Sequence, residues 1–461
     1  MRGAGYGLGV VLGAATSVFL LRHLGVVEFG RFATVAALLG IVSGVTDAGL
    51  TAVGARELSV RPPGAERRRL LENLVALRLL ITPLGVLAAA AFALAAGYDR
   101  TLVLGTLLGG LGIVLVNAQA TMVLPLSVEL RLATLTGFEV AKGALTLVGV
   151  ALLVAARASL LPFFAVQAAV GAVVLALTPR VLGRGVGLRP RLDRDTVRPL
   201  VREALPLAVA LAMNVIYFRV LVILVSLLAS EVAVGYFGTS FRVFEVLFVL
   251  PTLVLSVALP VLSVAGEGDD DRLRFGLQRM TEVALAASAL LAMVTIVLAE
   301  PALRLLGGEQ YEGAAPVLRI QALALVGVFL GQTWQLGLVA VRRQTALAVA
   351  NGAALVLVVV LGVVLIQADG ARGAAIAAVV AESALALFLL VALARAGRGL
   401  APSFGFVPRT AVAVAAGGAA LLVPGLSPWI TALVVTVVFL AVAVAVGALP
   451  RELLDALRRT R

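Results

Sequence analysis

Long apolar blocks, separated by short breaks that carry arginine, run through nearly the whole sequence. A block of about 20 apolar residues is long enough to cross the hydrocarbon core of a bilayer as a helix. Hydrophobic residues make up 61% of the 461 residues, and the mean hydropathy is +1.10. The chain is therefore predicted to be a polytopic membrane protein with almost no room for a soluble domain.

The expected fold class is all-α. Blocks such as 102–116 and 412–423 are apolar on all sides, whereas the strands of a membrane barrel would alternate apolar and polar residues. At about 20 residues per span we expect roughly fourteen transmembrane helices. They are expected to begin near residues 5, 33, 71, 102, 132, 159, 203, 233, 276, 315, 345, 373, 409 and 429.

Two basic breaks divide the predicted helices into groups. The breaks, at 183–202 and 395–409, predict two six-helix lobes and a final helix pair with a tail, over residues 1–200, 201–400 and 401–461. A faint repeat supports the two lobes, because FGRFAT at 29–34 resembles VGYFGT at 234–239. Lobes of equal orientation are common in transporters, with the substrate between them. A duplication without any mechanical role is the alternative.

The basic balance of the chain, +12 with a pI of about 11.2, is explained by topology rather than by nucleic acid. With a cytoplasmic N-terminus, the loops on that side and the tail hold roughly 26 of the 37 basic residues and the opposite side about 7. The strongest anchors are at 56–69 and 180–202. We therefore expect a multi-pass membrane protein with both termini in the cytoplasm.

Enzymatic chemistry finds little support in the sequence. The chain has no cysteine, one histidine, His23, and no Walker loop, so no catalytic residue, metal site or cofactor is predicted. The acidic run 269–271 is interpreted as a solvated loop. The first apolar block ends at 22–24 without a small-residue cleavage site, so it is expected to be a helix rather than a removed signal peptide.

Charged residues inside the apolar blocks are the candidate functional groups, because a charge at bilayer depth is costly unless it faces water or a partner. They are Arg78, Glu139, Lys142, Arg219, Arg242, Glu245 and Glu382. Glu139 with Lys142, and Arg242 with Glu245, are spaced to share a helix face, so each pair could instead neutralise itself. Arg78 is expected near a helix end, with its head group reaching the interface.

Arg219 differs from these pairs because no acidic residue lies within one turn of it in sequence. Its forked donors suit a phosphate or a carboxylate, so an anionic substrate is a natural partner. Snorkelling to the interface or pairing with another helix is the alternative. Small residues four apart, such as Gly40 and Gly44, allow close helix contact, for which ordinary bundle packing is a sufficient explanation.

Several local patterns resemble one family, the polysaccharide-transporter branch (Wzx-like oligosaccharide flippases) of the MOP superfamily. Their order and spacing cover nearly the whole chain. The segments are LLRHLGVVEFGRFA at 20–33, REALP at 202–206, VGYFGTSFRV at 234–243, ALPVLS at 258–263 and YEGAAPVLR at 311–319.

The resemblance implies a V-shaped pair of lobes around a cationic cavity, which moves an undecaprenyl-diphosphate-linked oligosaccharide from the cytoplasmic to the outer leaflet by alternating access. The substrate-binding candidates are Arg219, Arg242, Arg22, Arg31, Asp47, Lys142 and Glu245. Relatives often carry an acidic residue where this chain has Leu221, so ion coupling through that position is in doubt. Implied partners are the lipid-linked oligosaccharide, membrane lipids and polysaccharide polymerase machinery, with no nucleic acid.

Three alternatives remain open at the level of sequence. A multidrug exporter of the same superfamily would favour acidic and aromatic groups where this chain has Arg219. A lipid II flippase would share the fold and the charge. A membrane glycan polymerase or ligase would need a sizeable external loop, and the largest outer segment, about 300–313, is short.

Overall fold

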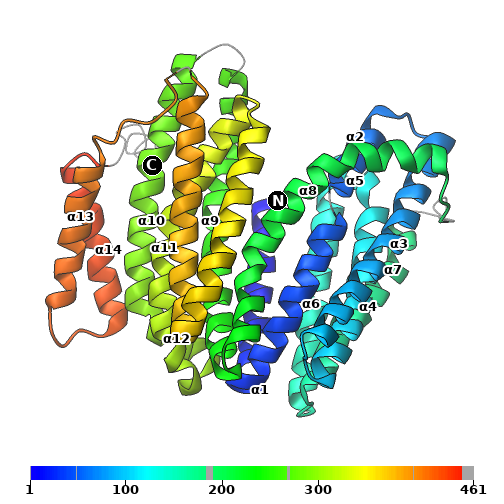
Figure 1. Cartoon of the computed structure of the whole chain (residues 1–461), viewed down its shortest axis with the longest axis horizontal. Coiled ribbons are helices and arrows are strands. Elements are labelled where there is room, and N and C mark those ends of the chain that lie inside the picture. Colours follow the sequence, from blue (N-terminus) through cyan, green and yellow to red (C-terminus); the bar gives the residue numbers. More distant parts are fainter. Residues whose placement is uncertain (1, 48, 183–189, 267–269, 398, 449–461) are drawn as a thin grey trace. The chain divides into compact units, whose positions relative to one another are not determined.

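The computed structural model describes residues 2–47, 49–182, 190–266, 270–397 and 399–448. Part of the first basic break, Asp269 and most of the expected cytoplasmic tail lie outside these ranges. Within them every regular element is helical, and the chain divides into two compact units, Met1–Leu227 and Leu228–Arg461 (Figure 1).

Unit 1 contains eight helices in the described part of the chain. They are α1 (Arg2–Asp47), α2 (Leu50–Val60), α3 (Ala65–Ala95), α4 (Arg100–Met122), α5 (Leu124–Val128), α6 (Leu132–Ala155), α7 (Leu160–Leu182) and α8 (Arg194–Leu228). Among them, α4 packs against α1, α3 and α7, while α6 packs against α1. Helix α8 begins within the first basic break. The sequence placed this helix in the second lobe, whereas all but its last residue belongs to unit 1.

Close contact between α4 and α7 depends on glycine. A Cβ added at Gly112 would lie 2.7 Å from the backbone nitrogen of Ala168, and one at Gly105 would lie 2.6 Å from the ring of Phe164. Both distances are shorter than any side chain tolerates without movement. These two glycines therefore set how near the helices approach, as small residues do in membrane bundles.

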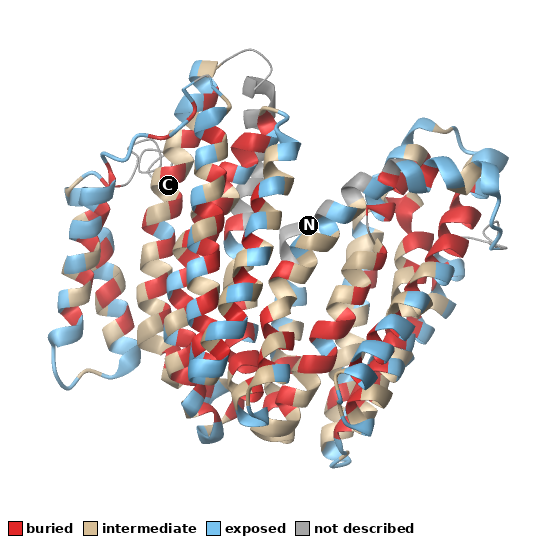
Figure 2. Ribbon diagram, viewed as in Figure 1, coloured by how far each residue is buried: buried red, intermediate tan, exposed pale blue. Residues whose placement is uncertain are grey.

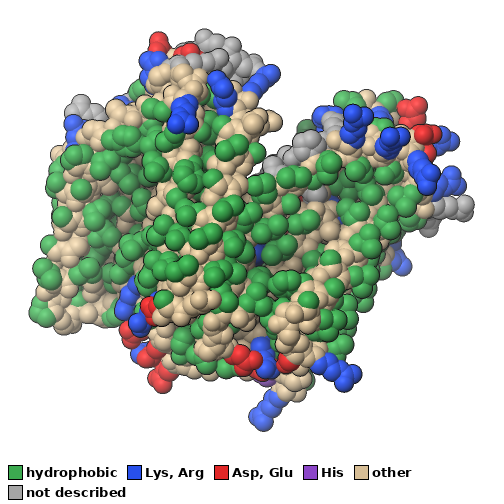
Figure 3. Space-filling model, viewed as in Figure 1, with side chains coloured by type: hydrophobic (Ala, Val, Ile, Leu, Met, Phe, Trp, Pro, Cys, Tyr) green, Lys and Arg blue, Asp and Glu red, His purple; other side chains and the backbone are tan. Residues whose placement is uncertain are grey.

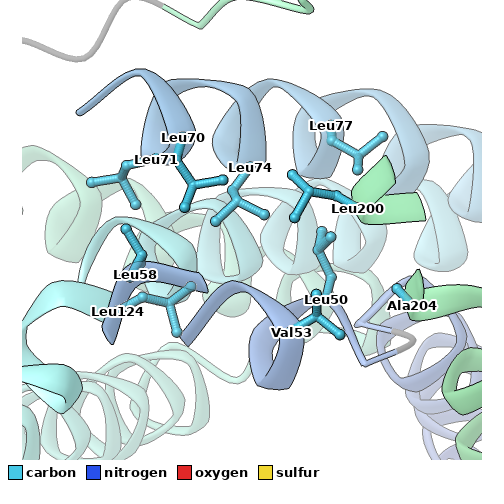
Figure 4. Packing of buried hydrophobic residues seen from close by; sticks show 10 residues of the cluster. All are labelled: Leu50, Val53, Leu58, Leu70, Leu71, Leu74, Leu77, Leu124, Leu200 and Ala204. Atoms are coloured by element: carbon cyan, nitrogen blue, oxygen red, sulfur yellow. The ribbon is translucent and has the colours of Figure 1, made fainter. Parts of the chain in front are cut away.

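The short helix α2 lies against α3 and was not anticipated from the sequence. Its buried residues Leu50, Val53 and Leu58 join a cluster with leucines of α3 and with Leu200 and Ala204 of α8 (Figure 4). Its exposed side carries arginine, so a hydropathy pattern reads this segment as a basic loop. The cluster fixes both α2 and the start of α8 on the end of α3.

Unit 2 is built around one central helix. Its elements are α9 (Glu231–Gly266), α10 (Asp270–Gly307), the 3-10 helix η1 (Glu309–Ala314), α11 (Ala315–Ala340), α12 (Gln344–Arg395), α13 (Val407–Ala419), the 3-10 turn η2 (Ala420–Leu422) and α14 (Pro428–Ala445). Helix α11 packs against α9, α10 and α12. The last pair, α13 and α14, packs on α10 through Ala286, Ala413 and Phe439.

Two long helices each contain two of the expected spans. In α1 the helix is interrupted at Gly25 (φ 71°), and in α12 at Asp369 and Gly370. Eleven described helices are long and apolar enough to cross a membrane, and α13 is a shorter apolar one. Counting both halves of α1 and α12 together with α13 gives about fourteen, so the all-α membrane fold is confirmed.

Apolar side chains cover the outer faces of both units. Figure 2 shows buried residues where helices meet and exposed ones on the outer faces, and Figure 3 shows that the visible surface of each unit is largely hydrophobic, with Lys and Arg gathered toward its ends. On α3, for example, Leu84 and Leu87 are 57% and 59% exposed. An apolar surface of this extent requires lipid as its solvent.

Candidate functional site

Arg219 lies inside the apolar part of α8, which runs from Ala204 to Leu228 with no other charged residue. At 1.5 Å per residue, about 13 Å of helix separates it from Leu228 and about 22 Å from Ala204, which places it within the depth of a bilayer core. Its side chain is half-buried and lies beside the ring of Phe218, with 5.7 Å between the guanidinium carbon and the ring centre. Arg219 is therefore a cation at lipid depth that keeps part of its surface open.

Two glycines of α1 pack directly against this part of α8. A Cβ at Gly40 would lie 3.2 Å from Nε of Arg219, and one at Gly44 would lie 2.5 Å from Cγ2 of Val215. The same spacing of four residues on both helices brings the two faces into register. The two glycines therefore allow the helices to pack closely, and Gly40 lies directly beside the side chain of Arg219.

A second arginine, Arg78 of α3, lies in a wholly different environment. Its side chain is only 2% exposed. It donates from Nε to Oγ1 of Thr121 (3.1 Å), from Nη1 to the carbonyl of Thr46 (2.9 Å), and from Nη2 to Oγ1 of Thr51 (2.9 Å) and to the carboxylate of Asp47. The expectation that Arg78 snorkels to the interface is therefore wrong, because protein groups from three other helices or helix ends satisfy its donors inside unit 1.

Asp47, predicted to contact substrate, ends α1 and is bound by this buried arginine. Its carboxylate also accepts a hydrogen bond from Thr51 in the first turn of α2. The side chain keeps 40% exposure. Arg78 thus orients Asp47 and ties the end of α1 to α2, while one side of the carboxylate stays open.

Arg22 and Arg31 lie near the interruption at Gly25, about 37 Å and 24 Å along α1 from Asp47. Arg31 pairs with Glu28 (3.2 Å) and with Asp99 (3.7 Å) between α3 and α4. Arg22 is exposed. The structure therefore does not gather the predicted residues of α1 at one point, but spreads them from the middle of that helix to its C-terminal end.

The two predicted ion pairs are both present. Nζ of Lys142 lies 2.5 Å from Oε1 of Glu139 on α6, and Nη1 of Arg242 lies 3.1 Å from Oε2 of Glu245 on α9. Arg242 is 51% exposed and Glu139 72% exposed. Each pair neutralises itself locally, and each keeps one exposed partner. Glu382 of α12 is buried at 9% exposure.

Buried amides form a feature that sequence analysis missed. On α4, both polar side-chain atoms of Gln119 and the Nδ2 of Asn117 are buried without a hydrogen-bond partner, and Oδ1 of Asn117 accepts from Ser43 of α1 at 3.4 Å. Neutral amides carry no charge pattern that a hydropathy reading can detect. Among the described residues no group of three His, Cys, Asp or Glu side chains could hold a metal ion.

Comparison with known proteins gives two family matches and a set of related folds. Residues 3–265 match the family described as polysaccharide biosynthesis protein, and residues 206–364 match the MatE family. No curated protein sequence matches the chain significantly. The family match covers more than half of the chain and agrees with the resemblance seen in its motifs.

Solved structures with a similar fold are transporters and flippases. The lipid II flippase MurJ, in an inward closed conformation, is 13% identical with a TM-score of 0.80, over 96% of this chain and 97% of that one. An inward-facing multidrug resistance MATE family transporter of the MOP superfamily is 16% identical with a TM-score of 0.71, over 84% and 94%. A MOP superfamily transporter from Pyrococcus furiosus is 16% identical with a TM-score of 0.56, over 85% and 92%. At these identities the likeness establishes the fold.

Proposed function

Because the chain belongs to the polysaccharide biosynthesis protein family and has the MOP transporter fold, we propose that it flips an undecaprenyl-diphosphate-linked oligosaccharide from the cytoplasmic to the outer leaflet of the bacterial cytoplasmic membrane. The observation that carries the proposal is Arg219, a half-buried cation inside the apolar part of α8, beside Gly40 of α1. A guanidinium at this depth suits a diphosphate that must pass through the same region.

The energetic need for such a group follows from the substrate. An ion transferred into hydrocarbon without a partner costs tens of kcal/mol in the idealised limit. A hydrated path with arginine donors removes most of that barrier, provided that binding stays loose enough for release. Arg242, Arg31 and Arg22 are proposed as further weak contacts along the path, with Asp47, Lys142 and Glu245 as polar groups that border it. Polymerase machinery is proposed as the consumer of the flipped substrate.

The membrane potential supplies a driving force in this proposal. Moving one charge through about 100 mV is worth roughly 2.3 kcal/mol, and the sign favours an anion that leaves an inside-negative cell. Transport should therefore slow when proteoliposomes are depolarised with an ionophore. A rate that is insensitive to depolarisation contradicts this part of the proposal.

The assignment of Arg219 is tested by translocation in proteoliposomes. Labelled lipid-linked oligosaccharide is scored by its accessibility to an impermeant lectin, for the parent chain, Arg219→Ala and the matched control Arg372→Ala, whose arginine is exposed on α12. We expect Arg219→Ala to abolish translocation with normal membrane insertion, and Arg372→Ala to retain it. Normal translocation by Arg219→Ala refutes the assignment.

Two other substrates are compared in the same vesicles. Lipid II tests the alternative drawn from the structural likeness to the lipid II flippase, and a cationic dye tests multidrug export. We expect neither to be moved faster than the oligosaccharide substrate. A preference for lipid II or for the dye would reassign the substrate while leaving the fold and family unchanged.

A further inference from the structure

The first three turns of α8 carry a row of exposed arginines. Arg194, Arg198 and Arg202 are spaced by four residues and all three are exposed. Residues four apart on a helix lie one above the other, about 6 Å apart. The three guanidinium groups, named here the arginine row, therefore follow one side of the helix.

The opposite side of this part of α8 is fixed to the protein. Leu200 and Ala204 are 5% and 6% exposed and pack in the cluster with α2 and α3 (Figure 4). The backbone N–H of Asp193 donates to Oδ1 of the buried Asn73 on α3 at 2.7 Å. Figure 1 shows α8 crossing beside α2 and α5 before it descends along α1. The row is thus held in a defined position rather than carried on a loose segment.

The described acidic side chains nearest in sequence, those of Asp193 and Asp195, do not form ion pairs with the arginine row. The Asp193 carboxylate accepts from Oγ1 of Thr196 (3.1 Å) and from the N–H of Asp195 (3.2 Å), so it serves as the cap of the helix. Asp195 is exposed in the first turn, where a negative charge stabilises the helix dipole. Among the described side chains, which exclude that of Glu203, no ion pair is formed by the row.

Neighbouring arginines make a clear contrast. On α2, Arg61 binds Glu57 at 2.6 Å, and on α3 Arg67 binds Glu129 at 3.1 Å and Arg68 binds Glu72 at 3.2 Å. Those residues have carboxylate partners within unit 1. Among the described groups, the three arginines of the row have no such carboxylate partner, as is also true of the exposed Arg69 and Arg131, so the row is available to an outside anion.

The position of the row along α8 indicates the headgroup level of the membrane. The uninterrupted apolar part of α8 begins at Ala204, directly after Arg202 and Glu203. A helical segment with one apolar side and a polar side rich in arginine is typical of an element that lies in the membrane interface. The positive-inside rule accounts for an excess of arginine here. That rule does not require three arginines spaced one turn apart on a helix segment whose other side is buried and hydrogen-bonded to the protein.

We propose that the arginine row binds the phosphates of anionic phospholipids and so docks the first half of α8 on the membrane surface. Guanidinium groups form paired hydrogen bonds with phosphate oxygens, and a spacing of about 6 Å lets neighbouring arginines contact adjacent headgroups. This role is independent of the transported substrate and of Arg219.

The test measures lipid binding by native mass spectrometry of the full chain in neutral detergent, titrated with phosphatidylglycerol or phosphatidylcholine. The variant R194Q/R198Q/R202Q is compared with R342Q/R343Q/R395Q, which removes the same charge from exposed arginines of unit 2. At about fivefold per arginine, we expect the row variant to lose on the order of 100-fold in affinity for phosphatidylglycerol. The control should lose little, and binding of phosphatidylcholine should not change.

Unchanged preference for phosphatidylglycerol in the row variant overturns the proposal. An equal loss in the control also overturns it, since net charge alone would then explain binding. A titration with farnesyl diphosphate separates the second source of phosphate: if binding of that ligand, and not of phosphatidylglycerol, falls in the row variant, the row serves substrate and the docking proposal is wrong. Should the triple variant fail to fold, each single variant is expected to show its own fivefold loss.

Discussion

Arg78 and Arg219 are both arginines of apolar helices in unit 1, yet they differ in how far they are buried. Arg78 is 2% exposed and donates to Thr46, Thr51, Thr121 and Asp47. Arg219 is half-buried inside the apolar part of α8, against a glycine and a phenylalanine. The first is closed to any ligand, whereas the second retains surface that a ligand can reach.

Under the proposed function, the difference separates an arginine that holds the fold together from one that binds substrate. A charge at bilayer depth must be compensated, and Arg78 is compensated by groups of the protein at fixed distances. Arg219 is placed beside the smallest residue, which leaves room for its long side chain. Removing Arg78 should therefore damage the fold, whereas removing Arg219 should damage transport.

The largest effect on stability is expected for Arg78→Ala. The substitution removes the Arg78 donor from the carbonyl of Thr46 and the hydroxyl of Thr121, leaves the Asp47 carboxylate with Thr51 as its described donor, and opens a cavity. We expect a loss of about 2–4 kcal/mol in the free energy of unfolding, and poor recovery of protein. Thermal unfolding in detergent measures it, with Arg219→Ala as the comparison. If the two variants unfold at the same temperature, the distinction drawn between the arginines fails.

A smaller loss of stability is expected for Gly44→Ala. Its Cβ would lie 2.5 Å from Val215, so α1 and α8 must separate, which costs about 1–3 kcal/mol. The double variant G44A/V215A should recover part of that loss because the smaller side chain makes room. The matched control Gly137→Ala has nothing within 4 Å and should unfold no earlier than the parent. Unfolding of Gly44→Ala at the parent temperature would show that the helices do not pack as described.

The smallest effect is expected for Gly40→Ala, and it concerns transport rather than stability. The added Cβ lies 3.2 Å from Nε of Arg219, so the guanidinium must shift by a few tenths of an ångström. Because misplacement of about 1 Å costs on the order of 100-fold in comparable sites, we expect a reduction of a few fold in the initial rate of flipping. The unfolding temperature should stay within error of the parent. An unchanged rate would indicate that the position of Arg219 is unimportant.

The sequence predicted the architecture well because long apolar blocks have few solutions in a bilayer. It did not predict that the first two spans join at Gly25, since one residue in a left-handed conformation leaves almost no mark in a hydropathy pattern. It also missed α2, whose buried residues Leu50, Val53 and Leu58 alternate with polar or small residues, and which packs against α3.

The site was predicted in part. Arg219 and the two ion pairs could be selected from local spacing, because charge at lipid depth is rare. The role of Arg78 could not, since its partners come from positions 27 to 43 residues away in sequence. Likewise, the glycines of α1 were seen as packing residues, but only the structure places one of them under Arg219.

The central claim is that Arg219 faces water within the depth of the bilayer core, and cysteine accessibility tests it most directly. The chain has no cysteine, so one can be introduced at Ala36, an exposed position one turn from Gly40 on α1, and separately at Leu84, which is exposed on the apolar face of α3. In membranes, Ala36→Cys should react with a charged, impermeant thiol reagent and be protected by the lipid-linked diphosphate, whereas Leu84→Cys should not react. An unreactive Ala36→Cys, or equal labelling at both positions, would contradict the account.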